Sequence, residues 1–236
     1  MSEPRRDLLY RFTFQDGAVR EFPVRLDPRT LKVELRPRSS YPDWTKLSFC
    51  RCPNCPFTED VRPRCPTAES VLDVVEFFQD RHSYEKALVE IVTPARTTQK
   101  RAALSEGASS LLGLLMPTGG CPILGLLRPN VLTHLPFATI DETAFRTLAM
   151  YLLAQFFVSQ RGGSGDWTLA RIGSFIEEVH LVNRHFSLRL GSTCLKDANL
   201  NAVSRLDAFA HLTDRIVRCK GEDLAPLFDD YLVPPA

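Results

Sequence analysis

The sequence lacks an excess of charge of either sign. Its 236 residues hold 29 Lys and Arg against 28 Asp and Glu, which gives a formal net charge of +1. Binding of nucleic acid through bulk electrostatics needs a basic excess, so this class of function is excluded. Hydrophobic residues make up 44% of the chain, which excludes a disordered polypeptide and is enough for a sizeable core.

A secretory signal is also lacking. No long apolar stretch follows the first residues, and Glu3 and Asp7 flank the basic pair Arg5 and Arg6. The seven Cys are an odd number in a chain large enough to have a core, which disfavours a secreted disulfide scaffold. Both observations predict a cytoplasmic protein with reduced thiols.

One stretch without charge, residues 107–127, has the length of a membrane-spanning helix. Two prolines and the pair Gly119 and Gly120 break its middle, which a helix interior tolerates poorly. We therefore predict a buried helix, a sharp turn and a short second apolar segment. An alternative is an interaction module in which Leu111 to Leu127 docks on a protein partner or on a membrane surface.

Alternating apolar and polar residues predict antiparallel strands over residues 8–14, 19–26 and 31–35, and a further strand over 88–92. Pro23 has no N–H to donate, so the second strand is expected at a sheet edge. Apolar residues at helical spacing predict helices over residues 67–80, 98–116, 139–160, 166–190 and 197–216.

These elements predict an α+β fold: a small N-terminal antiparallel sheet, a Cys/Pro-rich segment and a C-terminal antiparallel helical bundle. We place the β-rich region with its Cys-Pro segment at residues 1–94 and the bundle at 95–236, and expect them to form one compact unit. Thr139 and Glu142 have the spacing of a capping box. Residues 36–66 hold so many prolines that little regular structure is possible, so the segment is either cross-linked or mobile.

Four of the seven Cys are followed directly by Pro, namely Cys52, Cys55, Cys65 and Cys121. The product of 7 Cys and 17 Pro over 236 residues gives only about 0.5 such pairs by chance. Proline fixes φ and pre-orders a turn, and four thiolates are the set that a closed zinc site or an iron–sulfur cluster requires. We therefore predict a metal site formed by these four thiolates, with zinc or an iron–sulfur cluster as the cofactor.

Several alternatives stay open for these residues. Cys50, which lies two residues before Cys52, and His134 are alternate ligands, and haem is a weaker alternative as cofactor. The thiols could also form a redox-active dithiol, or be inert buried side chains. Because a closed shell of four Cys leaves no open coordination position, a structural or regulatory role, such as redox or metal sensing, is favoured over catalysis.

An enzyme is the second hypothesis, with Cys121 as nucleophile and His134 as base. It requires that these two residues meet in a pocket away from the other thiols. The Glu-x-x-His motif that ends at His180, combined with Asp207 and His211, is a weaker candidate for a di-iron site, because a second such motif is missing.

Several blocks of the chain resemble those of a family of uncharacterised bacterial proteins with Cys-Pro motifs, a domain of unknown function: residues 52–56, 65–68, 116–122, 134–137 and 197–202. The resemblance covers most of the chain. It implies a bacterial cytosolic origin and brings no activity to transfer. One departure is Gly120, where a small polar residue is expected.

Overall fold

The computed structural model describes residues 6–218 and 222–232, so Cys219 lies outside the described residues. The chain forms two compact units: Met1–Phe137 with Leu181–Asp207, and Ala138–His180 with Ala208–Ala236. The division runs through two long helices, which contribute residues to both units. Strands at the N-terminal end and helices in the remainder confirm the α+β class.

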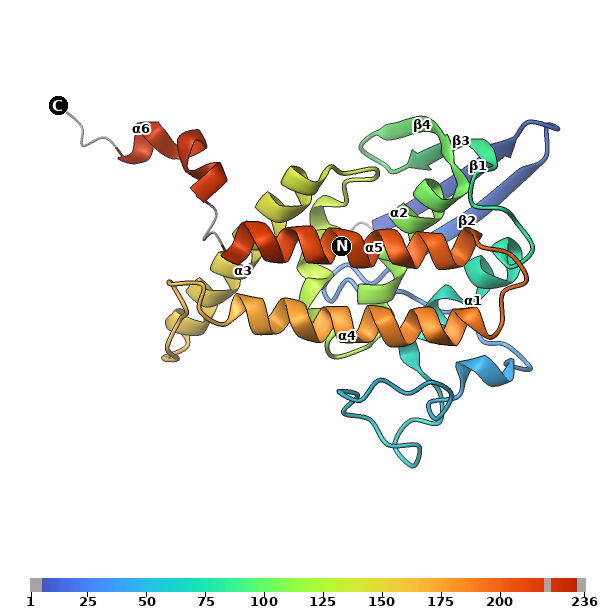
Figure 1. Ribbon diagram of the computed structural model, residues 1–236, viewed down its shortest axis with the longest axis horizontal. Helices are drawn as coiled ribbons and strands as arrows, with labels where there is room; N and C mark the ends of the chain where they lie inside the picture. The colour runs from blue at the N-terminus through green and yellow to red at the C-terminus, as the bar shows by residue number, and fades with distance from the viewer. Residues whose placement is uncertain (1–5, 219–221, 233–236) are drawn as a thin grey trace, which may run out of the picture. The chain divides into compact units, whose positions relative to one another are not determined.

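The first unit holds a four-stranded antiparallel sheet with the strand order β2-β1-β3-β4 (Figure 1). Its strands are β1 (Arg6–Phe14), β2 (Val19–Leu26), β3 (Lys86–Val92) and β4 (Thr97–Ala103). The alternating patterns predict β1, β2 and β3 correctly. Pro23 lies on the edge strand β2 opposite Leu9, as expected for a residue without an N–H.

Two strand predictions are wrong. Residues 31–35 form no strand and contribute a single bridge, from Val33 to Leu26. Residues 98–103 were expected to begin a helix, but they belong to β4, which pairs with β3 through a turn closed by Thr93 and Arg96. The residues of β4 are mostly polar and exposed, so they lack the alternating pattern that would indicate a strand.

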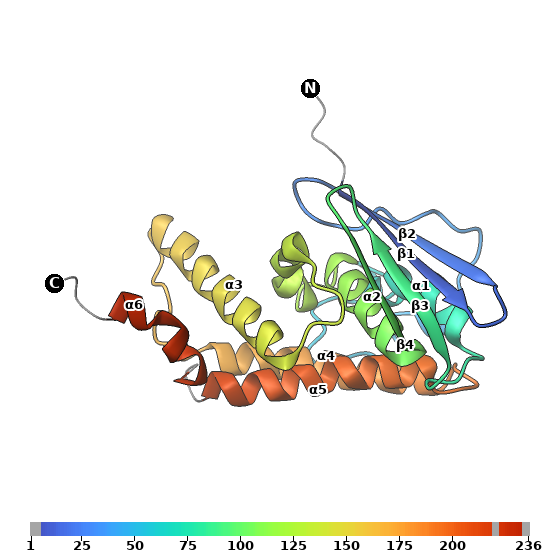
Figure 2. The same cartoon turned by 90° about the horizontal axis from the view of Figure 1, so that it is seen from above.

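Helices α1 (Pro66–Phe78) and α2 (Leu104–Thr118) cover the buried face of the sheet (Figure 2). The rings of Phe12 and Phe78 meet edge to face, with centroids 5.2 Å apart. Helix α2 approaches the sheet so closely that a Cβ on Gly107 would lie 2.7 Å from the Phe12 ring. Burial of these aromatic side chains, together with the aliphatic side chains of α1 and α2, drives the packing of the two helices on the sheet.

The first unit also contains the C-terminal half of α4 (Ile172–Gly191) and the N-terminal half of α5 (Ala198–Arg218), which run side by side in both views (Figures 1 and 2). Asn199 Nδ2 of α5 donates to the carbonyl oxygen of Val75 in α1 at 3.0 Å. These helices therefore form a third layer, on the side of α1 and α2 opposite the sheet.

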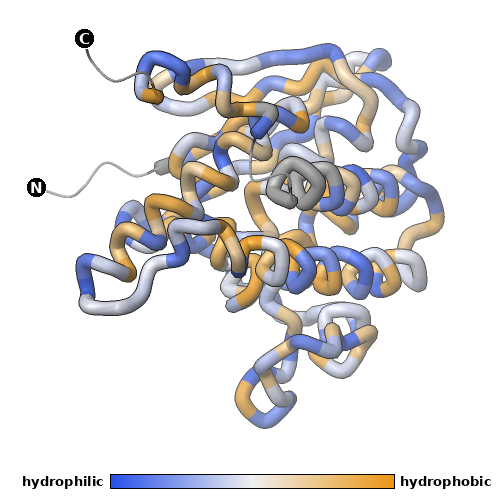
Figure 3. The backbone as a smooth tube through the Cα atoms, turned by 60° about the vertical axis from the view of Figure 1, so that its left-hand side comes forward, coloured by the Kyte–Doolittle hydropathy of each residue, from blue (hydrophilic) through white to orange (hydrophobic). Residues whose placement is uncertain are grey.

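The uncharged stretch, residues 107–127, is largely buried. In α2 its leucines from Leu111 to Leu115 are buried, which removes the docking hypothesis for this helix, although Leu126 in the following 3-10 helix η2 (Leu124–Thr133) is 60% exposed. Hydrophilic residues interrupt the hydrophobic ones along the helices (Figure 3). Among the described residues, no helix combines the length and the apolar character needed to cross a bilayer.

The second unit is helical. It contains α3 (Ile140–Gln160), the first half of α4, the second half of α5, the 3-10 helix η3 (Glu222–Phe228) and α6 (Asp229–Leu232). Leu148, Ile172 and Ile176 form its buried cluster. The predicted capping box is confirmed, because Thr139 Oγ1 accepts from the Glu142 N–H and the Glu142 carboxylate accepts from the Thr139 N–H.

The connection between α3 and α4 is held by the carboxylate of Asp166. It accepts hydrogen bonds from the backbone N–H of Arg171 at 2.8 Å and of Ala170 at 3.0 Å, and from the hydroxyl of Tyr151 at 2.7 Å. These donors, the Arg171 N–H foremost, hold the pKa of Asp166 far below its usual range. Burial and the nearby carboxylate raise the pKa of Tyr151 to about 12.

This network makes the folding stability of the protein depend on pH. Because the folded pKa of Asp166 is lowered, its contribution is present above the unfolded value of about 3.9 and is lost as the pH falls below it. We expect Asp166→Asn to lower the unfolding temperature at pH 7 and to flatten its decline between about pH 5 and pH 2. Thermal unfolding followed by circular dichroism checks this. Asp60→Asn, on an exposed turn, is the control, and an equally steep acid decline in Asp166→Asn would contradict the assignment.

Candidate metal centre

Backbone hydrogen bonds join the two ends of the Cys-rich segment. An antiparallel bridge pairs Lys46 with Arg64, and the Leu47 N–H donates to the Pro63 carbonyl at 2.9 Å. Residues 48–62 therefore form a loop that extends from the first unit below α4 in the view of Figure 1. Three side chains at the base are buried: Trp44, Thr45 and Leu47.

Cys52 and Cys55 sit at the two ends of one tight turn on this loop. The Cys55 N–H donates to the Cys52 carbonyl at 3.0 Å, with Pro53 at the first inner position of the turn. Arg51 Nη2 donates to the Cys55 carbonyl at 3.0 Å and steadies the turn from outside. The Cys-x-x-Cys knuckle expected from the sequence is thus built by backbone hydrogen bonds.

Cys65 and Cys121 are brought together by a close contact between two helices. Cys65 is the residue that directly precedes α1, and Cys121 follows the C-terminal end of α2. A Cβ on Gly119 would lie 2.5 Å from Ser70 Cβ and 2.9 Å from the carbonyl oxygen of Pro66, so only glycine lets the end of α2 approach the start of α1.

Glycine is needed at the next position for another reason. Gly120 has a φ of +104°, a backbone conformation that side chains rarely adopt. The small polar residue expected from the family resemblance would be strained there. This turn directs the chain from α2 to Cys121.

The proline after three of these cysteines has a common structural role. In each case the cysteine carbonyl accepts the hydrogen bond that closes the turn: from Cys55 to Cys52 at 3.0 Å, from Glu69 to Cys65 at 3.0 Å, and from Gly125 to Cys121 at 2.8 Å. Proline occupies the first position inside each turn, where its fixed φ fits and no N–H is needed. The Cys-Pro excess therefore reflects three turns that each begin at a thiol.

Electrostatics shows that the four thiols are neighbours. Burial foremost, and then the thiols of Cys65, Cys121 and Cys55, raise the pKa of Cys52 to about 12, while the guanidinium of Arg189 acts in the opposite direction. Cys52 thus interacts with the other three Cys-Pro thiols, and the metal site predicted for them stays a prediction.

Polar donors lie close to the sulfur of Cys121. Burial raises its pKa, but the backbone N–H groups of Leu124 and Ile123 point at the sulfur and oppose that rise. The hydroxyl of Thr67 also acts to lower the pKa of Cys121. This hydroxyl is buried and has no hydrogen bond of ordinary geometry. Such N–H donors around sulfur are typical of thiolates that bind metal.

The described cysteines form no disulfide. All six cysteines that the structure describes are free thiols, and the four of the predicted set are partly buried. Within this described part, no three of their sulfurs lie mutually within 4.8 Å.

A buried cation lies beside the set. Arg189 of α4 is 2% exposed, and its Nη1 donates to the carbonyl oxygens of Trp44 and Lys46 at the base of the loop, the second at 2.7 Å. Among the ion pairs of the described residues none joins Arg189 to a carboxylate. A buried positive charge of this kind calls for a negative partner.

The alternate ligands have other surroundings. Cys50 is exposed and has a φ of +47°. His134 lies at the end of η2, where its Nε2 is 2.5 Å from the hydroxyl of Tyr10 in the sheet.

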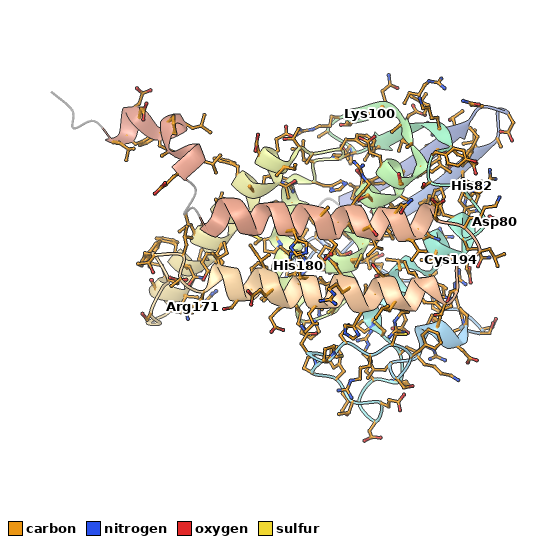
Figure 4. The ribbon with its side chains drawn as sticks, viewed as in Figure 1. Asp80, His82, Lys100, Arg171, His180 and Cys194 are labelled. Atoms are coloured by element: carbon orange, nitrogen blue, oxygen red, sulfur yellow. The ribbon has the colours of Figure 1, made fainter. Side chains whose placement is uncertain are left out.

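Cys194 lies near the turn between α4 and α5, with its sulfur 3.5 Å from Asn199 Nδ2 (Figure 4).

The geometry gives the enzyme hypothesis little support. It needs Cys121 apart from the other thiols and activated by His134, whereas Cys121 lies among those thiols. A nucleophilic thiol has a lowered pKa, but burial raises that of Cys121. His134 meanwhile faces Tyr10.

A second group of potential ligands has a different composition. The imidazole rings of His180 and His211 lie 3.6 Å apart, and Asp207 stands one helical turn before His211 on α5. Their ligand atoms lie within 4.8 Å of one another, so one metal ion could contact all three. These are three of the residues that the weaker di-iron hypothesis names. The group still lacks the second Glu-x-x-His motif of that centre.

Comparison with protein families matches residues 8–229 to a domain of unknown function, DUF6901. The chain belongs to this family. The expected membership in a family of unknown function is thereby confirmed, while the bacterial origin stays a prediction. Neither the curated proteins nor the solved structures gave a match.

Sequence reasoning misses Arg189 and Thr67 as parts of this site. Thr67 follows the Cys65-Pro66 pair, and its place two residues after a thiol is the one local hint. Arg189 reaches the loop from a helix far along the chain, and no local pattern signals it.

The contact at Gly119 can be tested by adding one methyl group. We expect Gly119→Ala to cost roughly 1–3 kcal/mol of stability, because its Cβ would overlap Ser70 and the Pro66 carbonyl. Gly125→Ala is the matched control, since nothing lies within 4 Å of that Cβ position. Urea unfolding measures both, and equal stabilities of the two variants would show that the close contact is absent.

Proposed function

We propose that this protein binds a metal centre through the thiolates of Cys52, Cys55, Cys65 and Cys121, and that the centre has a structural or regulatory role. The observation that carries the proposal is the meeting of four Cys-Pro thiols from three separate turns in one region of the first unit. Thiolates gathered in this number suit zinc or an iron–sulfur cluster.

The surrounding groups support a negatively charged centre. Four thiolates around Zn²⁺ carry a net charge of about −2, and a four-cysteine cluster is likewise negative. Arg189 supplies a buried positive charge next to Cys52. Cys65 stands at the N-terminus of α1, where the helix dipole favours negative charge.

The arrangement fits a centre that orders the loop. Two of the thiols stand at the junction of α1 and α2, and two stand on residues 48–62, which have few buried side chains. Metal binding would join the loop to the core, and its free energy would add to folding. Since all four positions would be filled by sulfur, no open site remains for substrate, and a sensing or structural role follows. Thiols in this state need a reducing compartment such as the cytoplasm.

Metal analysis of single variants tests this proposal. We expect Cys52→Ser and Cys121→Ser to retain less than roughly a tenth of the metal held by the unaltered protein, because hydroxyls are poor ligands for soft metals. Elemental analysis of protein purified both with and without air measures the retained metal.

The controls separate ligand loss from general damage. Cys194→Ser removes a partly buried thiol outside the set and is expected to leave the metal content unchanged. Cys50→Ser and His134→Gln test the alternate ligands in the same way. If neither preparation of the unaltered protein contains zinc or iron at a stoichiometric level, the proposal is wrong.

The charge of Arg189 can be tested apart from its packing. Arg189→Met is expected to weaken metal retention by about 10–100-fold against a competing chelator, because a group outside the ligand shell commonly has an effect of this size. Arg189→Lys keeps the positive charge and is expected to recover part of the affinity. Equal losses in the two variants would show that the guanidinium acts only through its hydrogen bonds to the loop.

A further inference from the structure

Two imidazoles and one carboxylate meet where α4 and α5 run side by side. His180 lies between the two helices (Figure 4), and the centroid of its ring is 3.6 Å from that of His211. Both histidines belong to the second unit. Asp207 precedes His211 by four residues, so these two side chains share one face of α5. One ligand atom of each residue lies within 4.8 Å of the other two.

This spacing is close to that of three ligands around one ion. Three atoms at most 4.8 Å apart have a common point at most about 2.8 Å from each, whereas zinc binds imidazole nitrogen and carboxylate oxygen at about 2.0–2.2 Å. Each ligand atom therefore has to move by less than about 1 Å to reach bonding distance. Small changes in side-chain torsions supply such a shift while both helices stay in place.

The three polar groups continue rows of apolar residues on their helices. On α4, the buried Ile176 stands four residues before His180, which is itself 8% exposed. On α5, the buried Val203 stands four residues before Asp207. Aliphatic side chains at the next positions would extend the same packing, whereas imidazole and carboxylate groups lose hydration there. A bound ion would offset that loss through its bonds to all three groups.

The donor set indicates which ion fits. Two imidazoles with one carboxylate suit zinc or ferrous iron, and sites of this composition keep coordination positions open for water or substrate. A di-iron centre takes a glutamate from each of four helices, so a set with one carboxylate fits a single ion instead. His211 is exposed, which leaves the set accessible from solvent.

We propose that His180, Asp207 and His211 bind one divalent ion, zinc or ferrous iron, with at least one coordination position open. This inference goes beyond the proposed function, because it uses none of the four Cys-Pro thiols. The thiolate centre has a closed shell, whereas an ion held by three protein ligands can bind an external ligand. The two sites have separate ligands, so each can be tested without the other.

NMR of histidine side chains tests the inference on the unaltered full chain. The protein with ¹⁵N-labelled histidine is titrated with Zn²⁺, and the ring resonances of its five His are followed. We expect the resonances of His180 and His211 to shift together, because coordination changes the electronic state of the ring nitrogens. His180→Gln and His211→Gln assign the two resonances. If both stay unchanged at saturating Zn²⁺, the inference is overturned.

Equilibrium dialysis counts the ion apart from the thiolate centre. In a chain that carries both Cys52→Ser and Cys121→Ser, we expect about one zinc per chain to remain bound. Adding Asp207→Asn or His211→Gln is expected to weaken this binding by more than about 10-fold, since even groups outside a ligand shell have effects of 10–100-fold.

A histidine on the same helix provides the control. His185 lies on α4 five residues after His180, and His185→Gln should retain the zinc of the dialysis experiment. His211 is exposed, so His211→Gln is expected to fold like the unaltered protein. Zinc affinity that is the same in His211→Gln and in His185→Gln contradicts the inference. That result leaves the thiolate centre standing, because the dialysis background lacks two of its four ligands.

Discussion

The contact between the start of α1 and the end of α2 determines where the distant parts of the cysteine set meet. Gly119 presses against Ser70 and the Pro66 carbonyl, and this closeness places Cys121 beside Cys65. Both helices also pack on the sheet through buried aromatic side chains. Two of the four thiols are therefore positioned by the same packing that forms the core, before any ligand binds.

The other two thiols depend on weaker constraints. Cys52 and Cys55 share one turn on a loop whose base is closed by a single bridge, from Lys46 to Arg64, and by the guanidinium of Arg189. A loop with so little buried surface gains order mainly from cross-links. The set thus combines a rigid half on the core with an adjustable half on the loop.

The sequence predicts those features that are encoded locally. Three strands follow from alternation, the capping box from Thr139 and Glu142, and the turns at the Cys-Pro pairs from proline, which acts locally in the first position of a turn. Strand β4 escapes prediction because its residues, mostly polar and exposed, lack the alternation of a half-buried strand. Arg189 escapes because it contacts a loop that is far away along the chain. The positive φ of Gly120 has no signal beyond the glycine itself.

The division between a rigid and an adjustable half bears on what the proposed centre could regulate. In a small zinc-dependent domain the metal supplies most of the core, so its loss unfolds the whole chain. Here the sheet and its helices bury their own aromatic and aliphatic side chains, and only the loop lacks a core. Occupancy of the centre would therefore change the order of residues 48–62 while the rest of the first unit keeps its fold. A change confined to one loop can be recognised by a partner, and this is the property that a sensing role requires.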